Sequence, residues 1–332
     1  MILNFQHNQS AHCENGVTSN LLKYYGINLS EPMVFGIGAG IFFSHMPFIK
    51  LNGMPVTSFR PLPGMIFKRV TRRLGLTIER VKFSNPEMAM SELDKVLLSG
   101  TPVGMLVGVF NLSYFPDAYR FHFNAHNLVA FGKENNQYHI SDPVMESIEF
   151  LNSEDLKRVR YAKGTYPPKG RMYYIKDVPK NINIEKAIYA GIKNASKDML
   201  TIPLPMFGVK GIDYLANKMQ NWENKLGERK ASHYLGQVIR MMEEIGTGGA
   251  GFRFIYAAFL QESADIINKP ELKQLSSEMT QIGDKWREFS VNAARNCKGR
   301  GDKVTYTELS QMLKNIAKSE RTIFTQLKQI IK

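Results

Sequence analysis

The stretch FQHNQSAHCENGVTSNLLKYYG, residues 5–26, places one of the chain's two cysteines, Cys13, where a polar segment changes into a helical pattern. Apolar residues at positions 17, 21 and 22 share one helical stripe, and Gly26 stands where a helix would end. The unpaired N–H groups and the dipole of a helix N-terminus stabilise a thiolate. The stretch therefore predicts a helix from Cys13 to Tyr25 whose first residue is a reactive thiol.

The pattern of elements changes along the chain from mixed to almost wholly helical. Residues 64–75 and 86–99 have helical spacing, with Pro86 suited to the first helical position and Gly100 to the stop. Four runs are predicted strands: TPVGMLVGVF (101–110), HNLVAFG (126–132), QYHISD (137–142) and RMYYIKDV (171–178). Helices are predicted beyond them, over about 184–200, 208–226, 230–246, 250–268, 270–296 and 306–331.

This change predicts an α+β protein with two domains that meet near residue 180. The 332 residues suffice for two cores, because domains usually hold about 100–200 residues. Hydrophobic residues make up 43% of the chain and charged residues 22%, which is typical of a folded globular protein and not of disorder. We predict a mixed domain over residues 1–180 that carries the thiol, and a helical domain over residues 181–332.

The composition limits the partners and the compartment. The net charge of +13 favours acidic partners, although nucleic-acid motifs are absent and the basic cluster FKRVTRRLG (67–75) is interpreted as a solvated helix face. The longest apolar run, PMVFGIGAGIFF (32–43), is shorter than the roughly 20 residues needed to span a bilayer. Two cysteines and a polar start without a signal-peptide pattern favour a reducing compartment. We expect a cytoplasmic protein with no membrane span and no nucleic-acid partner.

A cysteine nucleophile requires an imidazole to take its proton and a third group to orient the imidazole. Among His12, His122 and His126, the last opens a predicted strand that joins QYHISD through the turn KENN as a β-hairpin. Pairing Gly132 with Gln137 places His126 opposite Pro143 and beside Asp142. The residues therefore predict a site of Cys13, His126 and Asp142, with the amide of Asn127 as the alternative orienting group.

Two glycine-rich segments and the spacing of possible metal ligands give only weak evidence for a further functional site. FGIGAGIFF (35–43) has Ile41 where a dinucleotide fingerprint requires glycine, so we predict backbone packing at a turn near the active site. GTGGAGFR (246–253) could bring N–H groups and a cation to an anion, although helix capping and close helix packing explain it better. No set of residues has metal-ligand spacing, and we expect no bound metal.

The chain resembles the butirosin biosynthesis protein H family over nearly its whole length. HCENGVTSNLLKYYGINLSEPMVFGIGAGIFF (12–43) is similar to the opening of the family, and AHNLVAFG (125–132) with ISDP (140–143) is similar to its histidine and aspartate segments. FGVKGIDYLANKMQNW (207–222) and EIGTGGAGFRFIYAAFLQESADI (244–266) resemble the helical domain that accompanies this N-terminal domain.

The resemblance implies a papain-like N-terminal domain that accepts an acyl group from an acidic acyl carrier protein and passes it to a small amine. It implies Cys13 as nucleophile, His126 as general base and then acid, and Asp142 as the orienting carboxylate. Papain-like enzymes also place a glutamine before the cysteine as an oxyanion donor; Gln9 and Gln6 are both candidates, and Gln9 is retained.

In this interpretation the phosphopantetheine arm of the carrier brings the substrate, and the chain binds no cofactor of its own. The segment containing Gly248, Gly249 and Arg253 is a candidate binding site for that substrate or its phosphate. The helical domain would supply the pocket for the amine.

Three other functions fit the same residues. The site could hydrolyse a thioester or a peptide, in which case the product is a free acid and not an amide. Self-cleavage before Cys13 would expose an N-terminal nucleophile. A binding module for a carrier protein would retain its function after Cys13→Ala.

Overall fold

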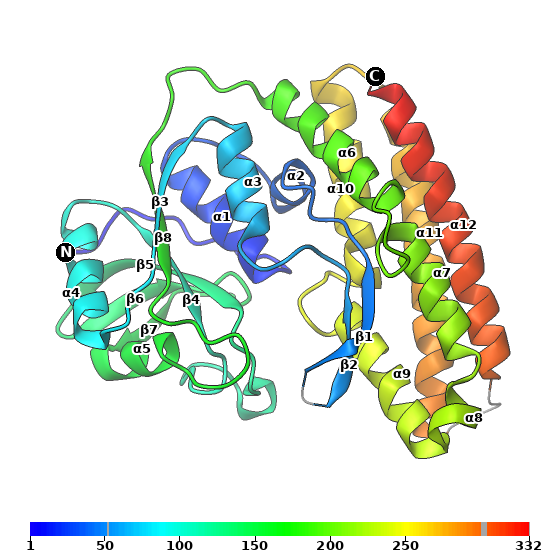
Figure 1. The fold of residues 1–332 in the computed structure, drawn as a ribbon. Helices are drawn as coiled ribbons and strands as arrows, with labels where there is room; N and C mark the ends of the chain where they lie inside the picture. The colour runs from blue at the N-terminus through cyan, green and yellow to red at the C-terminus, as the bar shows by residue number, and fades with distance from the viewer. Residues whose placement is uncertain (52, 300–303, 332) are drawn as a thin grey trace. The chain divides into compact units, whose positions relative to one another are not determined.

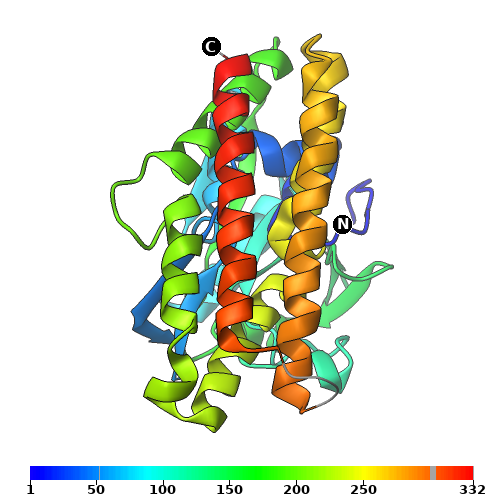
Figure 2. The ribbon, with the colours of Figure 1, turned by 90° about the vertical axis from the view of Figure 1, so that its right-hand side faces the viewer.

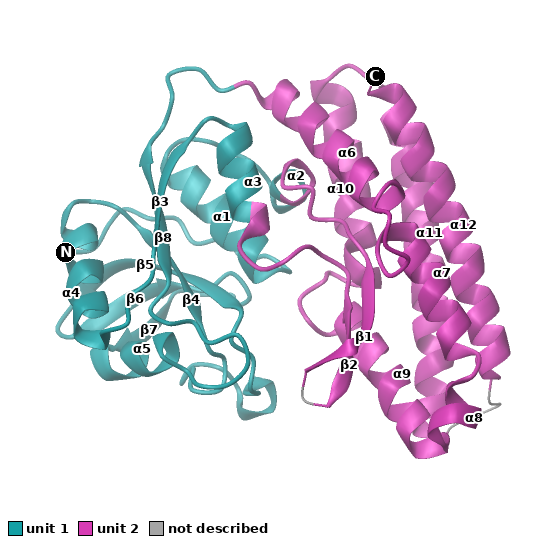
Figure 3. Ribbon diagram, viewed as in Figure 1, with its two compact units in different colours: residues 1–34, 67–182 teal, residues 35–66, 183–332 magenta. Residues whose placement is uncertain are grey.

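The computed structural model describes residues 1–51, 53–299 and 304–331, and they form two compact units (Figures 1 and 3). The first unit holds residues 1–34 and 67–182, and the second holds residues 35–66 and 183–332. The predicted α+β class is confirmed, because one unit is built on a sheet and the other mainly on helices. The chain passes from the first unit to the second for the last time after residue 182, close to the predicted boundary. Residues 35–66, which we assigned to the first domain, belong to the second unit.

The first unit is an antiparallel sheet with helices on both faces. Its strands follow the order β3-β8-β4-β5-β6-β7. They span β3 (Thr77–Val81), β4 (Val103–Val107), β5 (His126–Glu134), β6 (Gln137–Ser141), β7 (Glu149–Asn152) and β8 (Met172–Asp177). The helical elements are α1 (Cys13–Tyr24), α2 (Glu31–Ile37, which continues into the second unit), α3 (Met65–Arg73, which begins in it), α4 (Pro86–Leu98), η1 (Asp117–Tyr119) and α5 (Ser153–Arg160).

Helices α4 and α5 cover one face of this sheet and close its main core. Leu93 of α4 and Leu156 of α5 are fully buried against strand residues such as Met105 and Leu128. Burying such a side chain stabilises a fold by about 1.5–3 kcal/mol. Helix α1 packs against β5 on the other face, where the ring of Phe67 of α3 lies 4.5 Å from that of Tyr173. The thiol-bearing helix is thus held directly on the strand that begins with His126.

The hairpin of β5 and β6 forms with a register different from the predicted one. Gly132 pairs with His139, not with Gln137, and a bulge between Ala130 and Gly132 shifts the register before Val129 pairs with Ser141. The turn is tighter than expected because Asn135 and Asn136 both adopt positive φ, 46° and 65°, as a two-residue turn requires. Asparagine tolerates this conformation better than most residues. The segment KENN therefore contributes two residues to the strands.

The second unit consists of helices and one hairpin. The hairpin is β1 (Ser44–Leu51) with β2 (Met54–Ser58). The helices are α6 (Ile184–Leu200), α7 (Gly208–Met219), α8 (Trp222–Leu226), α9 (Glu228–Glu243), η2 (Ala250–Phe252), α10 (Arg253–Ile266), α11 (Glu271–Lys298) and α12 (Tyr306–Ile330). Figure 2 shows α11 and α12 side by side along most of their length. The predicted helix over 208–226 is interrupted after Met219 and forms α7 and α8.

Aromatic packing holds residues 35–66 in this second unit. The fully buried indole of Trp286 on α11 lies 6.0 Å from the ring of Phe43 and 5.4 Å from that of Phe59. These two phenylalanines flank the β1–β2 hairpin. Across residues 1–51, 53–299 and 304–331, every helix is too short or too polar to cross a bilayer.

Candidate active site

Cys13 is the first residue of α1, and the chain before it is held by polar contacts. The side chain of His12 caps the helix by accepting a hydrogen bond from the Asn15 N–H at 3.4 Å. The carboxylate of Glu31 accepts hydrogen bonds from the N–H groups of Ala11 at 2.9 Å and His12 at 2.8 Å. Cys13 itself is 7% exposed. The thiol therefore lies at a helix N-terminus, and the carboxylate of Glu31 holds the backbone just before it.

His126, the first residue of β5, lies between the thiol and Asp142, the residue after β6. Its Nε2 atom is 2.7 Å from Oδ2 of Asp142, and its ring also hydrogen-bonds Cys13. Because Nε2 donates to a carboxylate, Nδ1 is the nitrogen available to the thiol. His126 is 5% exposed and Asp142 is fully buried. The structure thus brings the three predicted residues into one hydrogen-bonded row.

The electrostatics of this row favour a charged imidazole. Burial alone lowers the pKa of His126, but the charges of Asp142 and Cys13 and the hydrogen bonds to both raise it to about 10. An imidazolium beside a cysteine stabilises the thiolate. The geometry supports a thiolate–imidazolium pair oriented by a carboxylate.

The loop between β4 and β5 supplies a further layer that the sequence did not reveal. The hydroxyl of Tyr114 donates to Oδ2 of Asp142 at 2.7 Å, the same oxygen that His126 contacts. The ring of Phe115 meets the imidazole edge to face at 5.5 Å. Burial and the Asp142 charge raise the pKa of Tyr114, so its hydroxyl stays protonated. The only sequence signal was the density of aromatic residues in a long connection, which is typical of functional loops.

Asn127, the alternative candidate for orienting His126, lies beside Cys13 instead. Asp142 orients His126, whereas the Asn127 side-chain nitrogen lies 3.8 Å from Sγ of Cys13. Its oxygen accepts a hydrogen bond from Tyr173 on β8 at 2.8 Å. Gln9 and Gln6 are exposed in the segment before α1, and the described contacts include no hydrogen bond from either amide to Cys13. The amide of Asn127 therefore lies beside the thiol, and the role of Gln9 stays a prediction.

The glycine-rich loop over 246–251 is occupied by internal contacts. Arg253 is fully buried and forms a bidentate pair with Glu320, with Nε to Oε1 at 2.8 Å and Nη2 to Oε2 at 2.9 Å. The Gly249 N–H donates to Thr247 and the Ala250 N–H to Glu243. Removing one partner of a buried ion pair typically costs about 3–5 kcal/mol. These contacts favour helix capping and packing for Gly249 and Arg253 over the predicted substrate or phosphate site, and the role of Gly248 stays a prediction.

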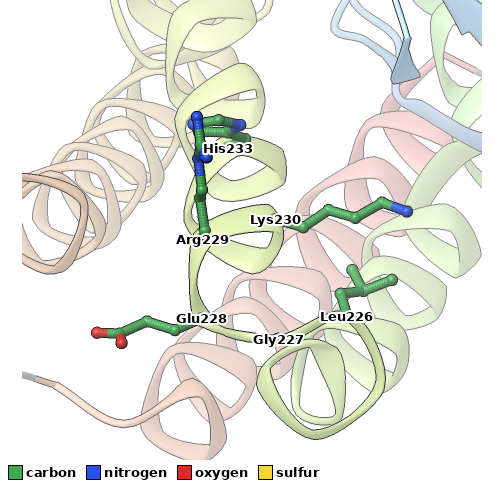
Figure 4. A pocket seen from close by; sticks show the side chains of 6 residues that line it. All are labelled: Leu226, Gly227, Glu228, Arg229, Lys230 and His233. Atoms are coloured by element: carbon green, nitrogen blue, oxygen red, sulfur yellow. The ribbon is translucent and has the colours of Figure 1, made fainter.

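A shallow open hollow of about 470 Å³ lies at the junction of α8 and α9. Its lining comprises Leu226, Gly227, Glu228, Arg229, Lys230 and His233. Figure 4 shows Lys230 extending to one side of α9 while Arg229 runs along the helix beside His233. The charged groups do not converge on one point, so the hollow lacks the features of a binding site.

The second cysteine, Cys297, lies in a setting unlike that of Cys13. Cys297 is half-buried and donates to the Ser232 carbonyl at 3.4 Å, and burial raises the pKa of its thiol. Neither feature favours a nucleophile. No cluster of three histidine, cysteine or carboxylate side chains suited to a metal occurs within the described ranges.

Helix α1 begins with Cys13 and packs on strand β5 of the antiparallel sheet, and β5 begins with His126, which pairs with Asp142. This is the arrangement of a papain-like cysteine enzyme. Two known family models match the chain. Residues 12–143 match "Butirosin biosynthesis protein H, N-terminal", and residues 154–327 match a domain of unknown function, DUF4872. The chain belongs to the DUF4872 family, and its residues 12–143 are similar to the N-terminal domain of butirosin biosynthesis protein H.

The curated proteins include no match to the chain. Among solved structures, a protein described as a C39-like peptidase from Bacillus anthracis is similar at 14% identity and a TM-score of 0.37. The match covers 54% of this chain and 98% of that protein.

Proposed function

We propose that this protein is an acyltransferase that moves an acyl group from an acyl carrier protein thioester to a small amine through an acyl-enzyme on Cys13. The row Cys13, His126 and Asp142 carries the proposal, because it combines a nucleophile, a proton carrier and an orienting carboxylate in hydrogen-bonded order. The butirosin biosynthesis match and the net charge of +13 support an acidic carrier as donor. No resident cofactor enters the proposal, and the phosphopantetheine arm belongs to the donor.

The first half-reaction forms the acyl-enzyme. The Cys13 thiolate adds to the thioester carbonyl carbon, and the carbonyl electron pair moves onto oxygen. When the tetrahedral intermediate collapses, the C–S bond to the phosphopantetheine arm breaks, and the imidazolium of His126 protonates the leaving thiolate. Neutral His126 remains, held by Asp142.

The second half-reaction releases an amide. Neutral His126 takes a proton from the amine as its nitrogen attacks the acyl-enzyme, and the Cys13 thiolate leaves, which restores the thiolate–imidazolium pair. Water competes for the same acyl group. A positioned amine reacts with an effective concentration of about 10⁵–10⁸ M in favourable intramolecular systems, which exceeds what bulk water offers.

The experiment is intact-mass analysis of the wild type and of Cys13→Ala after brief exposure to acyl-loaded carrier proteins without amine. We expect an acyl adduct on the wild type alone, and its conversion to an amide when a suitable amine is added. Release as a free acid in the presence of amines would assign hydrolysis instead. No adduct with any carrier, together with equal carrier binding by the variant, would refute the acyl-enzyme and favour a binding module.

The same spectra test self-cleavage before Cys13. Residues 1–12 are integrated into the first unit, where the Leu3 N–H donates to the Phe131 carbonyl at 3.0 Å and the ring of Phe5 stacks on that of Phe131 at 5.2 Å. We therefore expect the mass of the chain to include these residues.

A further inference from the structure

The side chain of Asn127 is fixed in orientation by its neighbours. One of its two terminal atoms lies 3.3 Å from the Ala125 carbonyl oxygen, which can only accept a hydrogen bond. That atom must be the nitrogen, and the other atom is then the oxygen that accepts from the Tyr173 hydroxyl at 2.8 Å. The second hydrogen of the amide group remains for Sγ of Cys13, 3.8 Å away. The amide thus presents an N–H to the thiol without a choice of flip.

Tyr173 reaches Asn127 because β4, the strand between β8 and β5, has a glycine at position 104. Tyr173 on β8 pairs with Gly104 on β4, and Gly104 pairs with Val129 on β5. Asn127 lies two residues before Val129 and therefore on the same face of the sheet. A Cβ atom at Gly104 would stand 2.3 Å from the Tyr173 ring. The phenol consequently lies across the glycine, and its hydroxyl meets the amide in a buried position.

We propose that the Asn127 side-chain N–H, together with the Cys13 backbone N–H, holds the oxyanion of the tetrahedral intermediate, and that Tyr173 positions this amide. The inference rests on the proposed acyl transfer and assigns its charge-stabilising group. When the carbonyl carbon of the thioester bonds to Sγ of Cys13, the negatively charged carbonyl oxygen becomes the nearest acceptor. The Asn127 N–H that faced the sulfur then turns to this oxygen. Asn127 is 2% exposed, so water does not compete strongly for this donor.

The test separates oxyanion stabilisation from thiol reactivity. The acetyl thioester of N-acetylcysteamine acylates Cys13 through an oxyanion, whereas iodoacetamide alkylates it by a displacement in which none forms. Both rates are measured by intact mass on the wild type, Asn127→Ala and Tyr173→Phe, at a pH where alkylation has reached its plateau. Loss of one oxyanion donor typically lowers a rate by about 10²–10³-fold.

We expect Asn127→Ala to acylate about 10²–10³-fold more slowly and to alkylate within a few-fold of the wild type. Tyr173→Phe keeps the ring over Gly104 and loses the hydroxyl, so a loss of roughly tenfold in acylation alone is expected. Tyr161→Phe is the matched control, because among the described residues its hydroxyl donates to the Phe83 and Asn85 carbonyls, away from Cys13. It should change neither rate. Gln9→Ala should also acylate normally.

Equal acylation by Asn127→Ala and the wild type, or a parallel fall of both rates, would overturn the inference. So would a loss confined to Gln9→Ala. If Asn127→Ala fails to fold by circular dichroism, Tyr173→Phe decides the matter with the same pair of rates. Failure of the proposed function has a different signature: the wild type would acylate with the small thioester in an Asn127-dependent way, but would pass no acyl group from a carrier to an amine.

Discussion

At the scale of single residues, one carboxylate oxygen organises the site. Oδ2 of Asp142 accepts from both His126 and Tyr114 at 2.7 Å, and Oδ1 accepts from the Val144 N–H at 3.3 Å. The charge of Asp142 helps to raise the folded-state pKa of His126 to about 10, above an unfolded value near 6.5. Protonation of His126 therefore stabilises the fold fully below about pH 6.5, and this contribution is lost as the pH rises through about 10.

Asp142→Asn should lower the pKa of His126. Without the carboxylate, only the charge and hydrogen bond of Cys13 are left to oppose burial, which lowers this pKa. An NMR titration of the imidazole is expected to show a midpoint near pH 10 in the wild type and a clearly lower midpoint in the variant. Urea unfolding should correspondingly show that the wild type loses more stability than the variant between pH 7 and pH 10.

Asp94→Asn is the matched control for this titration. Its carboxylate contacts Lys133 and Tyr138, so the His126 midpoint should not move. An unchanged midpoint in Asp142→Asn would contradict the assignment of Asp142 as the charge that holds the imidazolium.

At the scale of elements, close backbone contacts explain the glycines of FGIGAG. A Cβ atom at Gly36 would stand 2.0 Å from the ring of Phe259, and one at Gly191 on α6 would stand 2.5 Å from the Gly36 carbonyl oxygen. These glycines let α6 and the chain at residue 36 approach within the second unit. Close packing is therefore present at Gly36, which lies within α2 and not at the predicted turn, and its partners are α6 and α10.

Two glycine-to-alanine changes in helices of this unit should have opposite effects. Gly191→Ala forces a methyl group against backbone atoms and should destabilise by about 1–3 kcal/mol. At Gly236 in the interior of α9, the nearest atom to a new Cβ is Sγ of Cys297 at 3.9 Å, which is ordinary contact. Gly236→Ala should stabilise by about 0.5–1 kcal/mol through helix propensity. Thermal and urea unfolding would measure both, and equal effects would refute the packing argument.

At the scale of the whole molecule, the units do not follow the order of the sequence. Residues 35–66 leave the first unit and return to it, and between these crossings they place Phe43 and Phe59 on Trp286. A core phenylalanine is worth about 3–5 kcal/mol. Two of them approach the total stability of an ordinary domain, about 5–15 kcal/mol.

A fragment of residues 183–332 should consequently fail to form a cooperative fold. We expect a broad thermal transition and weak near-ultraviolet circular dichroism from Trp286, because the phenylalanines that pack on its indole are missing. Joining residues 35–66 to the fragment through a flexible linker should restore a sharp transition. A fragment that melts as cooperatively as the joined version would show that the hairpin adds nothing to this unit.

Much of the fold and site was predictable from local patterns. The start of α1 at Cys13, the extents of α4 and α6, and the strands β4, β5, β6 and β8 follow from periodicity and from helix-terminating residues. Helix α2, helix α5 and the strands β1, β2, β3 and β7 were not predicted, because short elements carry too few periods to be distinguished from loops. The predicted pairing of His126 with Asp142 was correct despite the wrong hairpin register, because both residues lie at the same end of the hairpin.

The sequence by itself determined the thiol at a helix start, the histidine that begins a strand and the carboxylate after the next strand, because each depends on neighbours within one or two elements. Only the tertiary structure decided that Tyr114 shares the oxygen of Asp142, that Tyr173 holds Asn127 across Gly104, and that residues 35–66 belong with the helices. Those contacts join residues far apart in the chain, and they form because sheet register and core packing bring the side chains together, which no local pattern records.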